Sequence, residues 1–153
     1  MNFSSKIIGV IGGSVCGEEE YELSREVGKL IAKNRAILIC GGMGGVMEAA
    51  CKGAKESGGI TVGVLPTFER ESANPYVQIP VVTGMGIGRN IIIVRSAQSI
   101  IAINGKYGTL SEIAYALQLE KPVIALKPWV EIPGMKIVQN PEEAVKLALS
   151  LAK

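Results

Sequence analysis

The sequence predicts an α/β protein with a doubly wound, mostly parallel sheet and helices on both faces. Short β-branched runs alternate with segments of helical periodicity along the whole chain, which is the pattern of parallel strands joined by helical crossovers. Glycine-rich stretches directly follow three of the runs, as they do where a strand leads into a helix. A length of 153 residues suits one domain over residues 1–153 with a hydrophobic core.

Seven runs are expected to form the strands. The first covers residues 6–11, and four more cover residues 36–40, 60–65, 99–103 and 121–126. Continuous apolar runs of this length are typical of buried parallel strands. Residues 79–83 are also extended, but Pro80 lacks a backbone N–H and therefore predicts an edge strand. A further short strand is expected at residues 135–138.

The helices are expected between these strands. Apolar residues recur at helical spacing over residues 18–33, and two more helices are expected over about 46–56 and 89–96. An apolar helix follows at residues 113–119, with Thr109 placed as its N-cap. The last helix starts at Asn140, an N-cap followed by Pro141, and runs nearly to the end of the chain.

Three glycine-rich loops are expected to meet at one edge of the sheet. They contain Gly12 and Gly13 before Ser14, the glycines of residues 41–45, and the segment 105–109. The carboxyl ends of parallel strands share an edge, and glycine lets the backbone approach a ligand closely. Helix N-termini at that edge favour anions. We therefore expect a phosphate or nucleotide site, although tight strand-to-helix packing also uses glycine.

The third loop carries the pair Thr109 and Glu112. Thr-x-x-Glu is a capping box, in which Glu112 would fold back on the backbone N–H of Thr109 without a chemical role. The same pair at the carboxyl edge of a parallel sheet also suits a ligand site, so both interpretations stay open. Arg89 follows another run of glycines, and its guanidinium suits a phosphate or an acid such as Glu112. Tyr107 is expected to be a half-buried wall residue that can stack on a base.

The composition argues against several classes of function. The net charge is only +2 and aromatic residues are few, so nucleic acid is not an expected partner. There is no histidine, and Cys16, Cys40 and Cys51 lack Cys-x-x-Cys spacing, so we expect free, buried thiols and no metal site. The sequence has no signal peptide and no apolar span of membrane length, which predicts a cytoplasmic protein without a membrane partner.

The third loop resembles a motif of a known family. Gly105-x-x-Gly108-Thr109-x-x-Glu112 is similar to the Pro-Gly-Gly-x-Gly-Thr-x-x-Glu motif of the LOG family. These Rossmann-like proteins were long mislabelled lysine decarboxylases, and they include cytokinin-activating phosphoribohydrolases. Nothing in this chain indicates a pyridoxal phosphate site, so the decarboxylase label does not apply.

The resemblance covers nearly the whole chain. The glycine-rich segment 41–47 is similar to the second glycine motif of the family, and Arg89 stands where the family has its catalytic arginine. The chain resembles most the branch of small proteins similar to molybdenum-cofactor carrier proteins and to the Rossmann core of the DNA-processing protein DprA. The resemblance implies that Arg89 and Glu112 are the catalytic groups. The loops and the resemblance together indicate ligand contacts by Gly13, Ser14, Gly42, Gly44, Gly45, Met47, Asn90, Gly105, Lys106, Tyr107, Gly108 and Thr109.

Four positions depart from the family pattern. Asn104 replaces the leading proline of the motif and Lys106 its second glycine. In phosphoribohydrolases an acid precedes the arginine and a lysine follows it, whereas this chain has Gly88 and Asn90 there. These changes favour a carrier or sensor that binds a nucleotide, a phosphate or the molybdenum cofactor and requires no other cofactor. The alternative is a phosphoribohydrolase that cleaves the N-glycosidic bond of nucleoside 5′-monophosphates.

A homodimer or higher homo-oligomer is also expected. The apolar residues 91–94 lie beside the weakly polar helix 113–119, and helices that are apolar around most of their surface need cover on more than one side. The LOG family forms dimers through such helices, which the resemblance implies here too.

Overall fold

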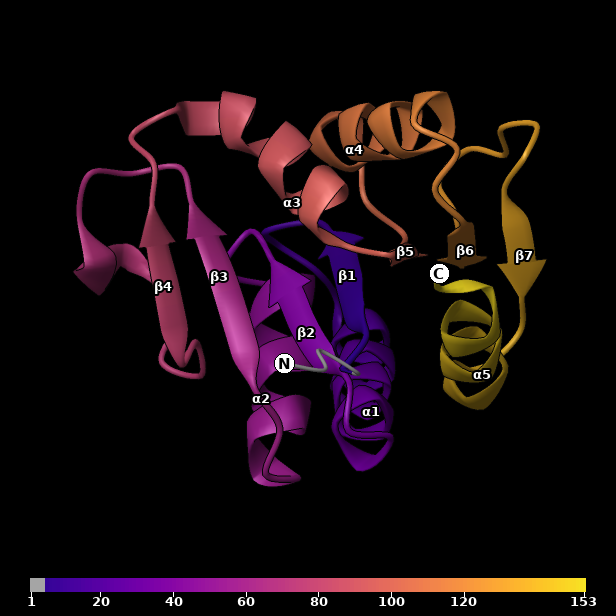
Figure 1. Ribbon diagram of the computed structural model, residues 1–153, viewed down its shortest axis with the longest axis horizontal. Coiled ribbons are helices and arrows are strands. Elements are labelled where there is room, and N and C mark those ends of the chain that lie inside the picture. Colours follow the sequence, from indigo (N-terminus) through magenta and orange to yellow (C-terminus); the bar gives the residue numbers. More distant parts are fainter. Residues whose placement is uncertain (1–4) are drawn as a thin grey trace.

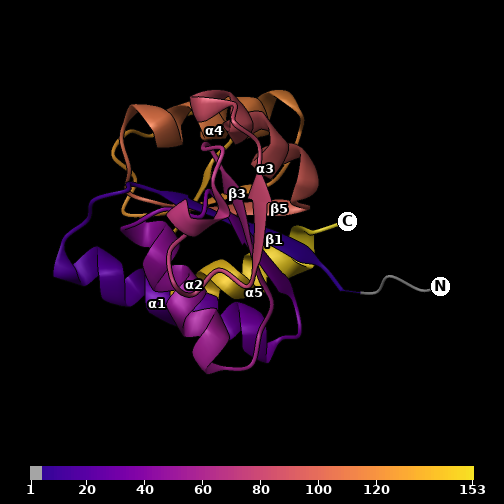
Figure 2. The same cartoon turned by 90° about the vertical axis from the view of Figure 1, so that its left-hand side faces the viewer.

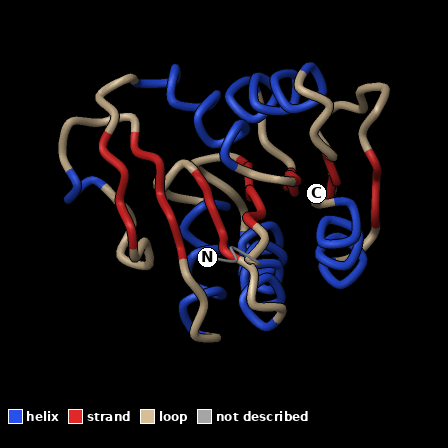
Figure 3. Tube along the Cα trace, viewed as in Figure 1, coloured by secondary structure: helices blue, strands red, loops and turns tan. Residues whose placement is uncertain are grey.

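The computed structural model describes residues 5–153, so residues 1–4 of the predicted domain lie outside the described residues. The strands lie close to the apolar runs that predict them, and Figure 3 shows them grouped in one sheet. They are β1 (Ile7–Gly12), β2 (Ile37–Cys40), β3 (Thr61–Leu65), β4 (Ile79–Val82), β5 (Ser99–Ile103), β6 (Val123–Leu126) and β7 (Lys136–Val138).

The sheet is parallel throughout. Its strand order is β4–β3–β2–β1–β5–β6–β7, and every pairing is parallel. The chain therefore builds outward from β1 to the edge strand β4 and then returns to place β5 on the other side of β1. Pro80 lies in that edge strand, as its missing N–H predicts. The predicted doubly wound α/β class is confirmed.

Helices cover both faces of the sheet (Figures 1 and 2). One face carries α1 (Glu18–Lys33), α2 (Val46–Glu56) and α5 (Pro141–Leu151), and the other carries α3 (Asn90–Ser96) and α4 (Tyr107–Gln118). Two short 3-10 helices, η1 (Arg70–Ser72) and η2 (Gly86–Arg89), lie in the connections on either side of β4.

Each face encloses its own apolar cluster, and the interior strand β5 contributes to both. Ile101 and Ile103 pack with the cluster that includes Val27 of α1, whereas Ile100 packs with the cluster that includes Ile113 of α4. Successive side chains of a strand point to opposite faces, so a continuous apolar run is what a strand covered on both sides requires.

Helices α1 and α2 approach each other closely at two glycines. A Cβ atom on Gly28 would lie 1.9 Å from the carbonyl oxygen of Ala50, and one on Gly53 would lie 1.8 Å from that of Arg25. Both distances are far inside van der Waals contact, so any side chain at either position would force the helix backbones apart. The missing Cβ atoms therefore set the spacing of this helix pair.

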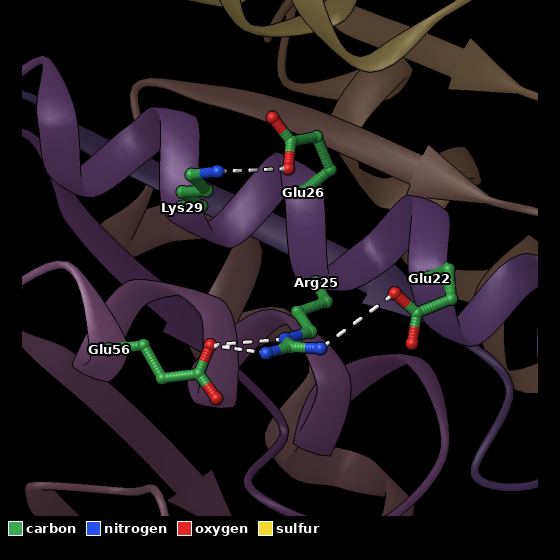
Figure 4. Close-up of polar contacts among 5 residues, drawn as sticks. All are labelled: Glu22, Arg25, Glu26, Lys29 and Glu56. Atoms are coloured by element: carbon green, nitrogen blue, oxygen red, sulfur yellow. Dashed lines mark hydrogen bonds and ion pairs between the residues drawn. The ribbon is translucent and has the colours of Figure 1, made fainter.

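Ion pairs also lie on the surface of α1 and α2 (Figure 4). Arg25 of α1 donates to Oε2 of Glu56 of α2 from Nε at 3.0 Å and from Nη2 at 2.9 Å. It also lies 3.9 Å from Glu22, and Lys29 lies 3.7 Å from Glu26. These side chains are well exposed to water, so the pairs contribute little stability compared with the glycine contacts beneath them.

The helix starts agree with the sequence except at α4. Asn140 caps α5 as predicted, since its Oδ1 accepts the backbone N–H of Glu143 at 2.9 Å. Helix α4 begins at Tyr107 with Lys106 as its N-cap, so Thr109 lies inside the first turn. The predicted N-cap at Thr109 is therefore wrong. Within residues 5–153, no helix combines the length and the apolar character needed to cross a membrane.

Candidate ligand-binding cleft

A cleft of about 450 Å³ opens at the carboxyl edge of the sheet beside β1 and β5. The strand order reverses between these two strands, and ligands of doubly wound proteins bind at such a switch point. The volume lies within the range of small-molecule sites. The cleft is lined by Gly12, Gly13, Ser14, Val15, Gly41, Met47, Ile87, Arg89, Asn90, Asn104, Gly105, Lys106, Gly108, Thr109 and Glu112.

Most of the predicted site residues are in this lining, but Gly42, Gly44, Gly45 and Tyr107 are not. Gly42, Gly44 and Gly45 lie in the second glycine loop but do not line the cleft. Gly45 serves the loop itself, because its φ is 61° and a Cβ atom there would lie 2.3 Å from the carbonyl oxygen of Gly13. Tyr107 is exposed rather than half-buried, and its ring forms a T-shaped pair with that of Trp129 at a centroid distance of 5.1 Å.

Arg89 is a buried cation fixed by three hydrogen bonds. It ends η2, and its Nε donates to the carbonyl oxygen of Val64 at 2.9 Å. Its Nη1 donates to Oδ1 of Asn90 at 2.8 Å and its Nη2 to the carbonyl oxygen of Gly41 at 3.3 Å. Burial lowers the pKa of Arg89, and the nearby Glu112 opposes that shift. The guanidinium thus joins the ends of β2 and β3 and places a fixed positive charge in the cleft wall.

Asn90 connects this cation to the first turn of α4. It accepts from Arg89, and its Nδ2 donates to Oγ of Ser111 at 3.1 Å. Ser111 in turn donates to the carbonyl oxygen of Gly108 at 2.6 Å. A hydrogen-bonded chain therefore ties the arginine to the turn whose backbone faces the cleft. This arrangement makes Asn90 a positioning residue for Arg89.

Glu112 is a buried acid in the cleft wall and not a capping residue. Glu112 is only 7% exposed, and no side chain caps the first turn of α4. Burial raises the pKa of Glu112 to about 8, although Arg89 favours the charged form. The capping-box interpretation is therefore wrong, and at neutral pH the carboxyl group is largely protonated.

The α4 loop leaves open space toward the cleft. Gly105 has a φ of 100°, and a Cβ atom there would lie 2.2 Å from Oγ1 of Thr109. By contrast, a Cβ atom on Gly108 would have no atom within 4 Å other than those of the neighbouring residues and the backbone of its own helix. The first N–H groups of a helix have no partners within the helix, and here no side chain caps them. This end of α4 can therefore receive an anion, beside the exposed Lys106.

Sequence reasoning missed several residues of the lining. Val15 and Ile87 are apolar and highly exposed, and nothing in their spacing sets them apart from ordinary loop residues. Asn74 has a supporting role outside the lining, because its backbone N–H donates to Gly42 and its Nδ2 to Met43, both to carbonyl oxygens at 2.9 Å. It anchors the second glycine loop from a distant part of the chain.

Comparison with known families identifies the family of this chain. The model of the SLOG cluster4 family matches residues 5–151. The chain belongs to the SLOG cluster4 family. An uncharacterized protein of Archaeoglobus fulgidus is 49% identical over 94% of both chains. A cytokinin riboside 5′-monophosphate phosphoribohydrolase of Mycobacterium tuberculosis is 33% identical over 80% of this chain and 70% of its own.

Several solved structures are similar to this SLOG cluster4 protein over nearly its whole length. The molybdenum cofactor binding protein of Rippkaea orientalis superposes with a TM-score of 0.92 at 34% identity, covering 99% of this chain and 100% of that one. The molybdenum cofactor carrier protein of Chlamydomonas reinhardtii follows with a TM-score of 0.85, 34% identity and coverage of 96% and 98%. DNA processing protein A of Helicobacter pylori, at 16% identity and a TM-score of 0.71, shares the fold alone. The predicted resemblance to the LOG family and its carrier-like branch is confirmed.

Proposed function

We propose that this SLOG cluster4 protein binds a nucleotide or a molybdopterin-like phosphorylated ligand in the cleft, as a carrier or sensor. The observation that carries the proposal is the fixed charge of Arg89 in a wall whose acid, Glu112, has a pKa raised to about 8. A largely protonated Glu112 leaves the charge of the arginine uncompensated at neutral pH. The cleft therefore attracts an anion, and the α4 N-terminus adds hydrogen-bond donors.

The relatives support a phosphorylated small molecule as the ligand. Two structural neighbours are named for the molybdenum cofactor, and one relative is named for a riboside 5′-monophosphate. Both ligands join a phosphate to a heterocyclic ring system. We assign the phosphate to the end of the cleft formed by Arg89, Gly108 and Thr109.

A phosphoribohydrolase is the second candidate, and Glu112 is the observation that favours it. A buried carboxyl group with a pKa of about 8 can donate a proton to a leaving base or, once ionised, stabilise an oxocarbenium-like ribose. Arg89 would then hold the phosphate or stabilise developing charge. The 33% identity with the mycobacterial phosphoribohydrolase supports the same chemistry.

One experiment separates the two candidates. Purified protein is incubated with AMP, GMP and other nucleoside 5′-monophosphates, and free base is measured by chromatography. A carrier binds these ligands and releases no base. Steady release of base by the wild type, abolished by Glu112→Gln, would establish the hydrolase instead. Mass spectrometry of small molecules released from the freshly purified protein identifies the ligand it carries.

Gly108→Val tests whether this cleft is the binding site. A Cβ atom on Gly108 meets no atom within 4 Å outside the neighbouring residues and the backbone of its own helix, and Gly108 lines the cleft in which the ligand is proposed to lie. We expect AMP affinity to fall by at least roughly tenfold, while the thermal unfolding temperature changes little. Unchanged AMP affinity in the folded variant would place the ligand elsewhere.

We also propose that the protein forms a homodimer through α3 and α4. These helices pack on one face of the sheet, and their outer side carries the exposed Tyr115 and the partly exposed Ile91. Covering such apolar side chains on association removes them from water.

A further inference from the structure

Large apolar side chains are exposed unevenly over the molecule. Among residues 5–153 the four most exposed are Val15 at 88%, Ile87 at 83%, Phe68 at 81% and Tyr107 at 75%, and the next is Met85 at 50%. Each of the four follows the carboxyl end of a strand or begins the helix after it. The apolar surface that the fold leaves in water is therefore concentrated at the edge that holds the cleft.

Two of these four side chains line the cleft itself. Val15 lies in the segment between β1 and α1, and Ile87 lies in η2 immediately before α3. Helices α1 and α3 cover opposite faces of the sheet. Segments that lead to helices on opposite faces of the sheet therefore bring the two side chains into one lining, which also contains Arg89 and Thr109.

We propose that Val15 and Ile87 form an apolar clamp that holds the flat heteroaromatic ring of the ligand. This inference rests on the proposed phosphorylated-ligand site and assigns a second subsite to it. A planar ring offers two apolar faces and can contact both side chains at once, whereas a sugar phosphate alone would leave both in water. Covering exposed apolar surface is favourable in proportion to the area removed from water.

The clamp makes the ring, and not the phosphate alone, a determinant of affinity. The site therefore selects purine or pterin compounds over sugar phosphates of the same charge. The polar groups of the cleft bind the anion. The two aliphatic side chains contact the faces of a flat ring and form no hydrogen bonds that would distinguish one ring from another. One site of this kind accepts several bases with similar affinity.

The test compares two probes by titration calorimetry, AMP and ribose 5-phosphate, which share the phosphate and differ in the ring. We expect the wild type to bind AMP at least roughly tenfold more tightly than ribose 5-phosphate. Val15→Ser and Ile87→Ser should each weaken AMP binding by roughly tenfold and leave ribose 5-phosphate binding unchanged. Phe68→Ser is the matched control, because Phe68 is equally exposed at the same edge but does not line the cleft.

The outcomes distinguish this inference from the function on which it rests. Equal affinity for AMP and ribose 5-phosphate, with no effect of the serine variants, would overturn the clamp and leave the phosphate site standing. A wild type that binds neither probe nor any other ring-bearing phosphate would overturn the proposed function and the clamp together. Both substituted side chains are exposed, so circular dichroism should show native folding in each variant.

Discussion

At the scale of one residue, Asn104 fits the backbone of the loop in which this chain departs from the LOG motif. Its φ is 47°, a left-handed conformation that asparagine tolerates. The ring of proline fixes φ near −65°, so the leading proline of the motif would not fit this loop as it is built here. Asn104 also lines the cleft, and its Nδ2 lies 3.5 Å from Oε1 of Glu20. Asparagine at this position is therefore compatible with the loop backbone of this chain, whereas proline is not.

Glu112 predicts a pH dependence of ligand binding. Its pKa is raised to about 8, so the group is largely neutral at pH 7 and ionises as the pH rises above 8. A phosphate monoester is already a dianion at pH 8, so only the protein changes its charge there. We expect AMP affinity to fall above pH 8, by up to about tenfold per pH unit, when measured by calorimetry.

Glu112→Gln is the matched control for that experiment, because glutamine keeps the shape and stays neutral. The variant should bind AMP like the wild type at pH 7 and more tightly than the wild type at pH 9. The ligand-free protein gives a second measurement. Folding raises the pKa of Glu112 from 4.5 to about 8, so the folded state binds the proton more strongly than the unfolded state. This contribution to stability is complete below pH 4.5 and is lost as the pH rises through 8, and Glu112→Gln should remove that loss.

At the scale of elements, the pair α1 and α2 depends on glycine contacts more than on ion pairs. Gly28→Ala places a Cβ atom 1.9 Å from a backbone oxygen of α2. Denaturant unfolding should therefore show a loss of about 2–3 kcal/mol, although alanine is the better helix former. Arg25→Ala, also in α1, removes the ion pair with Glu56 of α2 and should lower the free energy of unfolding by less than ~1 kcal/mol. The reverse ranking would refute this account of the interface.

The elements also show what the sequence could predict and what it could not. The strands β5 and β6 were predictable because both of their faces are buried, which requires continuous apolar runs. The start of α4 was not, because the true N-cap, Lys106, has no side-chain capping bond, whereas Thr109 has the side chain that caps helices.

The candidate site was predictable to a similar degree. Arg89 and Gly105 could be found because both lie in or directly after glycine-rich segments and match positions of the LOG motifs. The exposure of Val15 and Ile87, and the anchoring of a glycine loop by Asn74, depend on segments far apart in the sequence. No periodicity or spacing within a single chain records such contacts.

At the scale of the whole molecule, the sheet distributes its helices unequally. Three helices cover one face and α3 and α4 cover the other, with η2 leading into α3 (Figure 1). The cleft lies at the carboxyl edge, and three residues of its lining, Arg89, Asn90 and Glu112, come from the two-helix layer or from the segment that leads into it. A dimer through α3 and α4 would therefore form next to the ligand sites and hold the two clefts near the shared interface.

The last prediction tests that dimer. Tyr115 on α4 is 44% exposed, and Ile60, which directly precedes β3, is exposed to a similar extent at 42%. Light scattering of the wild type at micromolar concentration should give a mass near twice the 16.1 kDa of one chain. Tyr115→Glu buries a charge in the proposed interface, which is costly without a partner, so its mass should fall toward that of one chain. Ile60→Glu also replaces an exposed apolar side chain with a carboxylate, but it does so away from α4 and should leave the dimer intact. A wild-type mass of one chain, or equal dissociation in both variants, would overturn the proposed interface.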